Sequence, residues 1–266
     1  MSTSITPRVW GEISAHVHAA RLRYFAQTRA AEVRRADGAL AVVTGAFSNI
    51  ENGIVCERAD VQAEVAADLV GWIRERNVPA SWISETVEAP DELAEALRSL
   101  GCREETAGVD MGAEIRAAPK VARLSGVRIE EVVSSTALEQ CLDVAQTCQW
   151  FGREEHRERQ RRLYTNVGLG ADGPHRHWIA KRGEVPVGLA TAFFADGAVL
   201  LENLAVVAAE RRRGIGTALT TRRLAAAHSV GCTLAVLAPT AYSRPFYARL
   251  GFTLTSSPPR RWWYLP

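Results

Sequence analysis

The chain has 266 residues, of which 47% are hydrophobic and 23% are charged, which is enough apolar material for one large domain or two domains of ordinary size. Its formal net charge is only +2, which argues against a strongly basic nucleic-acid-binding surface. The N-terminus does not resemble a secretory signal and no apolar stretch approaches the ~18 residues of a membrane span, so we expect a soluble, cytoplasmic protein without nucleic-acid or membrane partners.

The first half of the chain alternates patterns that are typical of helices and strands. Residues 59–76 carry apolar side chains at helical spacing, and a segment that Pro90 and Asp91 open stops at Gly101, as helices often do. We expect helices over residues 14–35, 59–76 and 92–101, and strands over residues 39–44, 53–56, 80–84 and 109–115. A poorly patterned stretch with Pro119 and a Ser-Gly pair follows, and it is typical of a linker. We therefore divide the chain into a first domain over residues 1–118, a linker over 119–126 and a second domain over 127–266.

The second half has a richer pattern. We expect strands over residues 127–133, 177–181, 186–194, 198–207 and 232–238, helices over residues 136–150, 154–166 and 214–229, and then a short helix ending at Gly251 and a final strand. This β-α-α-β-β-β-α-β-α-β order predicts an α/β unit with its own core.

The cysteines do not indicate a metal centre or a disulfide framework. The five are Cys56, Cys102, Cys141, Cys148 and Cys232. They form an odd set without a C-x-x-C pair, so neither a zinc site nor a disulfide framework has the required spacing. We expect buried, reduced thiols and no bound metal.

The segment 202–223 carries the chemistry. An apolar strand runs into a short turn, and Arg211-x-x-Gly214-x-Gly216 then opens a helix. Free backbone N–H groups and the positive end of the helix dipole attract a phosphate, and glycines bring those amides close to an anion. Alone, the loop is equally compatible with a glycine-containing helix start beside exposed arginines, and it is neither a Walker nor a Rossmann loop.

A further segment, residues 236–252, places Tyr247 four residues before Gly251 and Phe252, on a short helix after the next strand. With this pair of segments the sequence resembles the GNAT superfamily of acyl-CoA-dependent N-acyltransferases. Residues 202–223 resemble the pyrophosphate-binding motif R/Q-x-x-G-x-G/A of that family, and residues 236–252 resemble its Y-x-x-L-G-F motif. The resemblance covers residues 127–266. It implies an α/β (α+β) GNAT fold, in which helices flank a mixed central sheet, and acetyl-CoA as the acyl-donor co-substrate.

The resemblance also implies a set of cofactor-binding residues. They are Leu204, Ala205, Val206, Val207, Arg211, Arg212, Arg213, Gly214, Ile215, Gly216 and Thr217. The amides of residues 212–217 would cradle the CoA pyrophosphate, and the backbone of residues 205–207 would pair with the pantetheine arm. The N–H of Val206 would polarise the thioester carbonyl as an oxyanion donor.

Two residues are the candidates for proton transfer. Tyr247 matches the family residue that protonates the departing CoA thiolate, while the alternative is a core tyrosine with a satisfied hydroxyl. Glu202 lies where the family often has a carboxylate, and we expect it to act as the general base. The alternatives for Glu202 are a solvated strand carboxylate, with His177 or His175 as the base, although these histidines are more typical of a loop or a strand edge.

The acceptor amine is expected near the connection between the first two helices of the second half. Trp150 and Phe151 would form an aromatic wall there, and Glu154 would attract a cationic amine. We favour the alternative, a hydrophobic helix end followed by a salt-bridged surface helix. For Trp262 and Trp263 near the C-terminus, a final strand with buried aromatics is favoured over a place in the cleft.

The first half resembles a degenerate GNAT domain of a tandem GNAT protein. Residues 90–104 echo the Y-x-x-L-G-F motif, but Cys102 replaces its Phe and Leu97 stands where the Tyr would be. The favoured function is transfer of an acetyl group from acetyl-CoA to a primary amine of a small molecule, by direct attack in a ternary complex of a monomer or homodimer. The alternatives are acetylation of a protein lysine or N-terminus, and a non-catalytic acyl-CoA-binding regulator.

Overall fold

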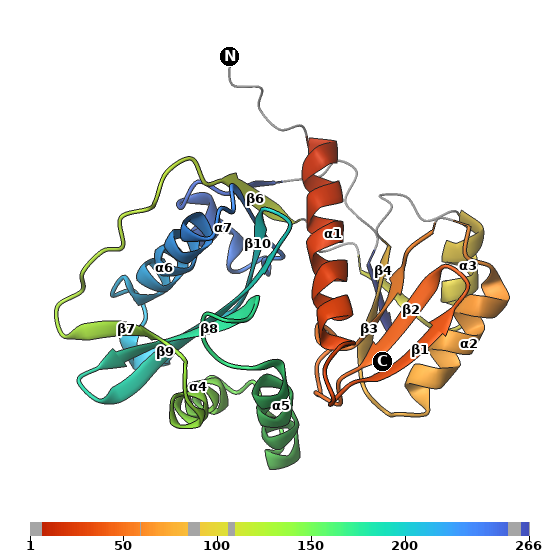
Figure 1. Ribbon diagram of the computed structural model, residues 1–266, viewed down its shortest axis with the longest axis horizontal. Coiled ribbons are helices and arrows are strands. Elements are labelled where there is room, and N and C mark those ends of the chain that lie inside the picture. Colours follow the sequence, from red (N-terminus) through yellow and green to blue (C-terminus); the bar gives the residue numbers. More distant parts are fainter. Residues whose placement is uncertain (1–6, 59, 85–90, 106–109, 255–261, 266) are drawn as a thin grey trace. The chain divides into compact units, whose positions relative to one another are not determined.

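The computed structural model of the chain describes residues 7–58, 60–84, 91–105, 110–254 and 262–265. The chain forms two compact units, of which the first consists of residues 1–112 and 238–266 and the second of residues 113–237. In Figure 1, where colour follows the sequence, the first unit therefore contains both the red N-terminal part and the blue end of the chain. The structure thus divides the chain differently from the predicted boundary, because the last segment returns to the first unit.

The first unit begins with elements that the sequence largely predicts. They are α1 (Pro7–Phe25), β1 (Glu32–Ala36), β2 (Ala39–Val43), β3 (Gly53–Cys56), α2 (Ala63–Arg74), β4 (Ala80–Ser84), α3 (Asp91–Ser99), β5 (Arg103–Glu105) and β6 (Met111–Glu114). The helix predicted over residues 14–35 is wrong at its C-terminal end, since the helix stops at Phe25 and residues 32–36 form a mostly exposed edge strand. Pairing with β2 overrides the helical composition there. Strand β5 has no counterpart among the predictions, and Pro90 lies outside the described residues.

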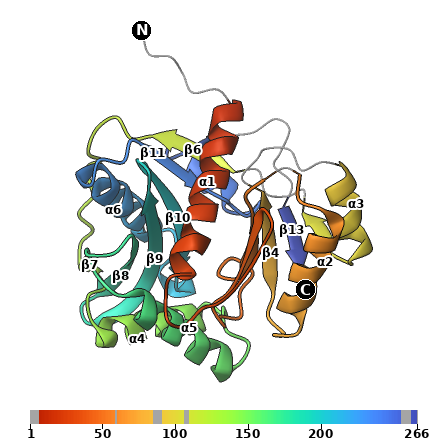
Figure 2. The ribbon, with the colours of Figure 1, turned by 45° about the vertical axis from the view of Figure 1, so that its right-hand side comes forward.

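The sheet of the first unit has the order β1-β2-β3-β4-β13-β5, where β13 (Trp262–Leu265) is the last strand of the chain. Strands β3 and β4 are parallel, whereas β1 with β2, β2 with β3, and β13 with both β4 and β5 are antiparallel. Helix α1 covers one face of this sheet, and α2 with α3 covers the other (Figures 1 and 2). The unit is therefore completed by a strand at residues 262–265, far along the sequence from its neighbours at residues 80–84 and 103–105.

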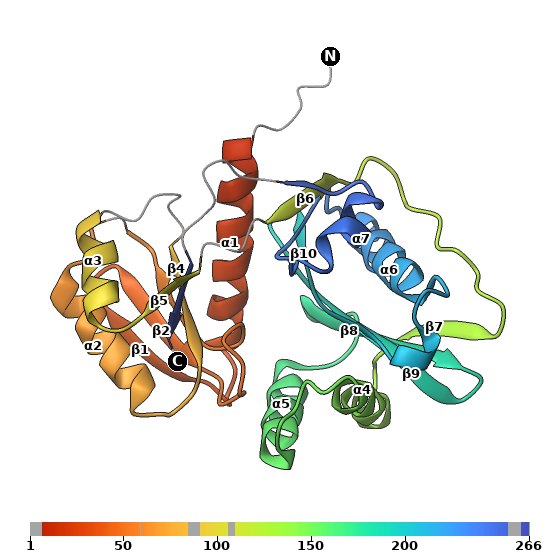
Figure 3. The ribbon, with the colours of Figure 1, turned by 180° about the vertical axis from the view of Figure 1, so that it is seen from behind.

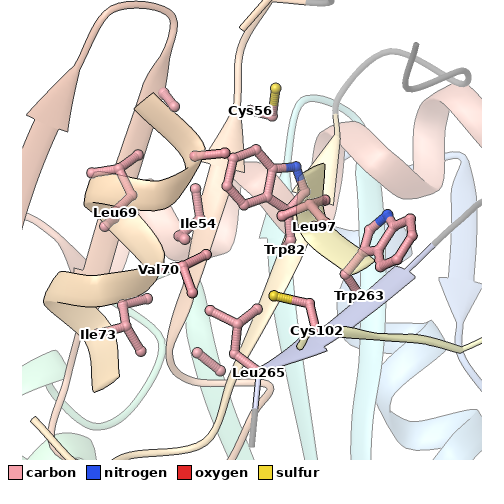
Figure 4. Packing of buried hydrophobic residues seen from close by; sticks show 14 of the residues in the cluster. Ile54, Cys56, Leu69, Val70, Ile73, Trp82, Leu97, Cys102, Trp263 and Leu265 are labelled. Carbon is pink, nitrogen blue, oxygen red and sulfur yellow. The ribbon is translucent and has the colours of Figure 1, made fainter. Parts of the chain in front are cut away.

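Tryptophans from two distant segments fill the core of the first unit. Trp82 on β4 and Trp263 on β13 are both fully buried, and the two residues are paired across the strands. Figure 4 shows them beside Leu97 and Cys102, with Leu69 and Ile73 of α2 on the same side of the sheet. The prediction of a final strand with buried aromatics is therefore confirmed for Trp263.

The second unit contains the strands and helices predicted between residues 127 and 238, whereas the predicted short helix and final strand belong to the first unit. The elements of the second unit are β7 (Val127–Glu131), α4 (Ser135–Thr147), α5 (Glu154–Val167), β8 (His175–Arg182), β9 (Val185–Ala195), β10 (Ala198–Val206), the 3-10 turn η1 (Ala208–Glu210), α6 (Ile215–Ser229) and β11 (Leu234–Leu237). The chain then continues into α7 (Arg244–Ala248) and β12 (Thr253–Leu254).

The second sheet has the order β12-β6-β11-β10-β9-β8-β7. Its pairs are antiparallel from β7 to β10, and β10 is parallel to β11. Helix α6 packs on one face, and α4 and α5 lie on the other, as the view from behind shows most clearly (Figure 3). No helix among the described residues is long and apolar enough to span a membrane.

The two sheets repeat one order of elements. In each sheet antiparallel strands lead to a parallel pair that a helix connects, β3-α2-β4 in the first and β10-α6-β11 in the second. A short helix follows in each case, and its C-terminus is capped in the same way. Gly101 after α3 and Gly251 after α7 both have positive φ, and the next residue donates its N–H to Leu97 in one case and to Tyr247 in the other. The resemblance between residues 90–104 and the Y-x-x-L-G-F motif is therefore also a resemblance in backbone geometry.

Candidate functional site

The start of α6 offers backbone donors that lack an intrahelical acceptor. Arg212 and Gly214 have φ values of 62° and 83°, which turn the chain sharply before the helix begins at Ile215. Gly214 is the N-cap residue and has no side chain to cap the first amides. Such amides and the positive end of a helix dipole attract an anion. We call residues 211–217 the Gly214 loop.

Neighbouring side chains fix the shape of the Gly214 loop. A Cβ atom at Gly214 would lie only 3.2 Å from Leu124 Cδ2, so this position admits only glycine without strain. Glu210, at the end of η1, accepts hydrogen bonds of 3.0 and 2.7 Å from Arg182 at the end of β8. Those hydrogen bonds lower the pKa of Glu210, which stays ionised and holds the turn against the sheet.

Strand β10 leaves its parallel neighbour halfway along its length. Its register with β11 covers only Ala198, Val199 and Leu200, although β10 continues to Val206. On the other side β10 stays paired with β9, and the N–H of Val207 donates to Val187 at 3.0 Å. In an antiparallel ladder the residues on either side of a residue bonded in this way point their N–H and C=O away from the paired strand, here β9. The N–H of Val206 therefore faces the side on which β11 no longer pairs.

The side chain of Arg211 lies on the end of β10. Its Nε donates to the carbonyl oxygen of Val206 at 3.0 Å, and its positive charge lies near the thiol of Cys148 at the end of α4. Burial raises the pKa of the Cys148 thiol, while the charge of Arg211 acts in the opposite direction. Arg211 thus bonds the end of β10 and lies near the connection between α4 and α5, while Arg212 and Arg213 are exposed in the loop.

Glu202 lies in a buried polar cluster on the α4 and α5 face of the sheet. It is paired with Thr191 on β9, which is in turn paired with His177 on β8, so the three side chains share one face. The Glu202 side chain is only 7% exposed, and its Oε2 lies 3.9 Å from Nε2 of His175. Tyr164 of α5 stacks at a tilt on both histidine rings, with centroids 5.4 Å from that of His175 and 4.3 Å from that of His177. The predicted base and both alternative histidines therefore belong to one cluster.

His177 is the neutral member of this cluster. Its ring is 3% exposed, and Nδ1 lies 2.9 Å from the hydroxyl of Thr191. Burial lowers the pKa of His177 to about 3, so the ring carries no charge at neutral pH. A strand-edge position is wrong for His177, because it is paired with Thr191 of β9 on one side and its carbonyl oxygen accepts a hydrogen bond from the N–H of Val132 on the other.

Tyr247 lies on α7, in the first unit. Its ring is 7% exposed and packs edge-on against Phe246 and Phe252. No hydrogen bond to its hydroxyl is present among the described residues, so the alternative of a core tyrosine with a satisfied hydroxyl finds no support in this part of the chain.

The predicted acceptor residues follow the end of α4. Gln149 has positive φ, and the N–H of Trp150 returns to the carbonyl of Ala145, a Schellman-type helix end. This cap leaves Trp150 42% exposed, and Phe151 half-buried. The Glu154 carboxylate is exposed and lies 3.8 Å from Arg157. The favoured alternative, a helix end followed by an ion-paired surface helix, describes α5 well. The exposed side chain of Trp150 lies just before this helix.

Three residues around the middle of β10 escape prediction from the sequence. The strand is irregular between Glu202 and Ala205, Asn203 has φ of 49°, and its Nδ2 donates to Tyr164 Oη at 3.0 Å. Arg223 of α6 bonds the backbone on the opposite face of the sheet. The one hint in the sequence is an Asn within an apolar strand. Because Asn is depleted in strands and common at positive φ, it indicates that the strand is irregular at that position. The described residues hold no cluster of His, Cys, Asp or Glu that suits a metal ion.

Residues 138–252 match the profile of the Acetyltransferase (GNAT) family. The match begins in α4 and includes β10, the Gly214 loop and the Tyr247 motif. This part of the chain is therefore similar to GNAT acetyltransferases. No curated protein matches the sequence.

Solved structures resemble the whole chain. A GCN5-related N-acetyltransferase from Kribbella flavida is 18% identical with a TM-score of 0.67, over 95% of this chain and 94% of that protein. A functionally unknown conserved protein from Staphylococcus epidermidis is 15% identical with a TM-score of 0.56, over 88% and 92% of the two chains. A GCN5-related N-acetyltransferase from Sphaerobacter thermophilus is 14% identical with a TM-score of 0.53, over 98% and 92%. The predicted fold, mixed sheets flanked by helices in a GNAT-like arrangement, is confirmed.

Proposed function

Starting from the match of residues 138–252 to the Acetyltransferase (GNAT) family, we propose that this chain transfers the acetyl group of acetyl-CoA to a primary amine of a small molecule. Transfer occurs by direct attack in a ternary complex. One observation carries the proposal: the free edge of β10 leads, through η1 and the Gly214 loop, to the uncapped N-terminus of α6. A single segment therefore offers backbone groups to the pantetheine arm and to the pyrophosphate of one donor molecule.

The donor is held mainly by backbone groups. The amides of Ile215, Gly216 and Thr217 bind the pyrophosphate, and the exposed Arg212 and Arg213 add positive charge beside it. Residues 204–207 pair with the pantetheine arm along the edge that β11 leaves open. The carbonyl of Val206 already accepts a hydrogen bond from Arg211, so the N–H of Val206 is the group that this residue contributes. Arg211 thereby serves the donor site through the backbone of β10.

The Val206 N–H is the candidate oxyanion donor. It points away from β9 into the open side of β10, where a thioester carbonyl beside the pantetheine would lie. When the amine nitrogen bonds to the thioester carbon, negative charge moves onto the carbonyl oxygen. A fixed N–H aimed at that oxygen stabilises the charge without reorganisation, and removing such a donor costs ~10²–10³-fold in rate in other enzymes.

Two side chains handle protons. Glu202, directly or through a water, takes a proton from the acceptor ammonium, so that the nitrogen lone pair can attack the thioester carbon. The carbon–sulfur bond then breaks, and Tyr247 donates its phenolic proton to the departing thiolate. The products are the amide and free CoA. The buried position of Glu202 near His175 supports a base that works through a short relay in place of open solvent.

The acceptor is assigned to the connection between α4 and α5. Trp150 offers an exposed aromatic face, Phe151 lies next to it, and the exposed Glu154 carboxylate attracts a cationic amine. Arg211 bonds the end of β10, and its charge acts on Cys148 at the start of this connection, which supports a common site for the acceptor and the thioester.

The first half of the chain, residues 1–118, is proposed to be a degenerate GNAT copy. Its parallel pair, connecting helix and glycine-capped short helix repeat the order found in the second half. The connection between β3 and α2 has no R-x-x-G-x-G sequence, and a fully buried Leu97 takes the position of Tyr247. Residues 1–118 therefore lack both groups on which donor binding and thiolate protonation depend.

The experiment that tests the proposed function is a thiol-release assay with acetyl-CoA and a library of primary amines, followed by mass spectrometry of the products. Amine-dependent release of CoA with a mass gain of one acetyl group is the expected result. Lysine-containing peptides and proteins with free N-termini form a second arm, and turnover only in that arm would replace the small-molecule proposal with protein acetylation. Binding of acetyl-CoA with no turnover in either arm would indicate a regulator and contradict the enzyme.

A further inference from the structure

A fully buried arginine lies in the middle of α6. Arg223 is 0% exposed, four residues after Leu219 and four before Ala227, which are also fully buried. Its place is therefore the face of α6 that packs on the sheet, where an apolar side chain is the rule. Burying a guanidinium is costly unless hydrogen bonds compensate, so its partners explain why it is there.

Those partners are backbone carbonyls at an irregularity of β10. The Arg223 Nη1 atom donates to the carbonyl oxygens of Thr191 and Glu202, each at 2.9 Å, and Nη2 donates to the hydroxyl of Thr220 at 3.2 Å. Thr191 and Glu202 are the last pair in register before β10 shifts against β9, and pairing resumes only at Ala205. The guanidinium satisfies carbonyls at the very point where the ladder is interrupted.

The irregularity is also held from the opposite face. Asn203, at positive φ, reaches Tyr164 on α5 through its side-chain amide. The backbone between Glu202 and Ala205 is thus fixed by Arg223 from one side of the sheet and by Tyr164 from the other.

We propose that Arg223 is a positioning residue that sets the conformation of β10 at Glu202 and so aligns the base with the donor-binding edge of residues 204–207. This inference rests on the proposed function. The carboxylate of Glu202 and the N–H of Val206 lie on either side of the irregularity, so its geometry determines how the base and the oxyanion donor are oriented toward each other.

Helix α6 also connects Arg223 to the proposed donor site. The same helix carries the Gly214 loop at its N-terminus and Arg223 nine residues later, which is ~13 Å along a rigid helix. A donor bound at the loop and the acceptor base at β10 are therefore connected through one element. Binding of the donor restrains α6, and α6 restrains the strand that presents Glu202.

Variants of Arg223 with a neighbouring control test the inference. Arg223→Gln removes the charge and the planar fork, while Arg223→Lys keeps the charge but cannot bridge two carbonyls and a hydroxyl with the same geometry. The matched control is Arg222→Gln, an exposed arginine on the same helix. For folded Arg223 variants we expect kcat with the amine to fall ~10²-fold, as misplacement of reacting groups does, while the Kd for acetyl-CoA changes much less. A purely structural role would lower the melting temperature and leave kcat per folded molecule unchanged.

Hydrogen exchange provides a readout that does not need turnover. Acetyl-CoA should protect the amides of residues 204–207 in the wild type and in Arg222→Gln, and protect them less in Arg223→Lys. Wild-type kcat and wild-type protection in both Arg223 variants would overturn the inference while leaving the proposed function intact. A wild type that binds acetyl-CoA but acetylates no amine would contradict the proposed function, and the exchange pattern would still decide the role of Arg223. If Arg223→Gln does not fold, Arg223→Lys carries both measurements.

Discussion

The Gly214 loop allows a quantitative prediction for donor binding. Gly214 has φ of 83° and faces Leu124 at 3.2 Å from where a Cβ would lie. In Gly214→Ala the left-handed conformation costs about 1–2 kcal/mol, and Leu124 must also move. In Gly214→Asp a negative charge is added near the bound pyrophosphate. At ~6 Å and an effective dielectric constant of about 20, repulsion by one phosphate charge is about 3 kcal/mol before screening by salt.

These magnitudes predict a graded loss of affinity. We expect Gly214→Ala to weaken acetyl-CoA binding by about 10-fold and Gly214→Asp by about 10²-fold or more, since each ~1.4 kcal/mol corresponds to a factor of ten. Isothermal titration calorimetry measures both. Gly197→Asp is the matched control, because Gly197 also has positive φ, at 76°, and lies in the turn before the other end of β10.

The control separates backbone strain from the loss of the binding site. Gly197→Asp should lose stability without losing affinity for acetyl-CoA. If folded Gly214→Asp bound acetyl-CoA as tightly as the wild type, the pyrophosphate would not lie at the start of α6, and the assignment of the Gly214 loop would be wrong.

Three further variants test the chemistry and the polar cluster. Tyr247→Phe should lower kcat by up to ~10²–10⁴-fold with almost unchanged acetyl-CoA affinity, and a wild-type rate when chemistry limits turnover would refute its role as the acid. Glu202→Gln should lower kcat/KM at pH 7 and recover partly at high pH, where an amine of pKa ~10 is increasingly free, whereas an unchanged pH–rate profile would move the role of base to His177 or bulk water. Because burial holds the pKa of His177 at about 3, below that in the unfolded chain, its contribution to stability is complete above pH ~6.5 and is lost as the pH falls toward 3. In His177→Gln the free energy of unfolding should thus vary less steeply between pH ~4 and ~6, by up to about 1.4 kcal/mol per pH unit, and equal slopes in denaturation experiments would contradict a neutral His177.

The sequence predicts local backbone features better than it predicts which distant segments pair, and the reason is physical. The Gly214 loop depends on local chemistry, since glycine at positive φ and a helix start leave their signature in adjacent residues. The final strand is also predicted, but its partners are not. A strand four residues long contains nothing that states which sheet it joins, so the pairing of Trp263 with Trp82 appears only in three dimensions.

The polar groups around β10 illustrate the same limit at the scale of single residues. The spacing between Leu219, Arg223 and Ala227 places Arg223 on a buried helix face, but the carbonyls that it bonds are free only because β10 is irregular. Helical periodicity thus indicates that Arg223 is buried, and strand register is needed to show why. Tyr164 and Asn203 likewise meet across 39 residues of sequence.

The repeated order of elements leads to a last prediction, that the chain binds a single CoA. Helix α2 connects the parallel strands of the first sheet as α6 does in the second. The first turn of α2 contains Glu64, and the pocket at the start of α2 is also lined by Asp60 and Glu92. Carboxylates at a helix N-terminus compete with a phosphate for the same amides and repel it. Calorimetry should therefore give one acetyl-CoA per chain, and Gly214→Asp should leave no second, weaker site. A stoichiometry of two, or residual tight binding in Gly214→Asp, would mean that the first copy also binds acetyl-CoA, although it lacks the glycines of the Gly214 loop. The interpretation of this copy as degenerate would then be wrong.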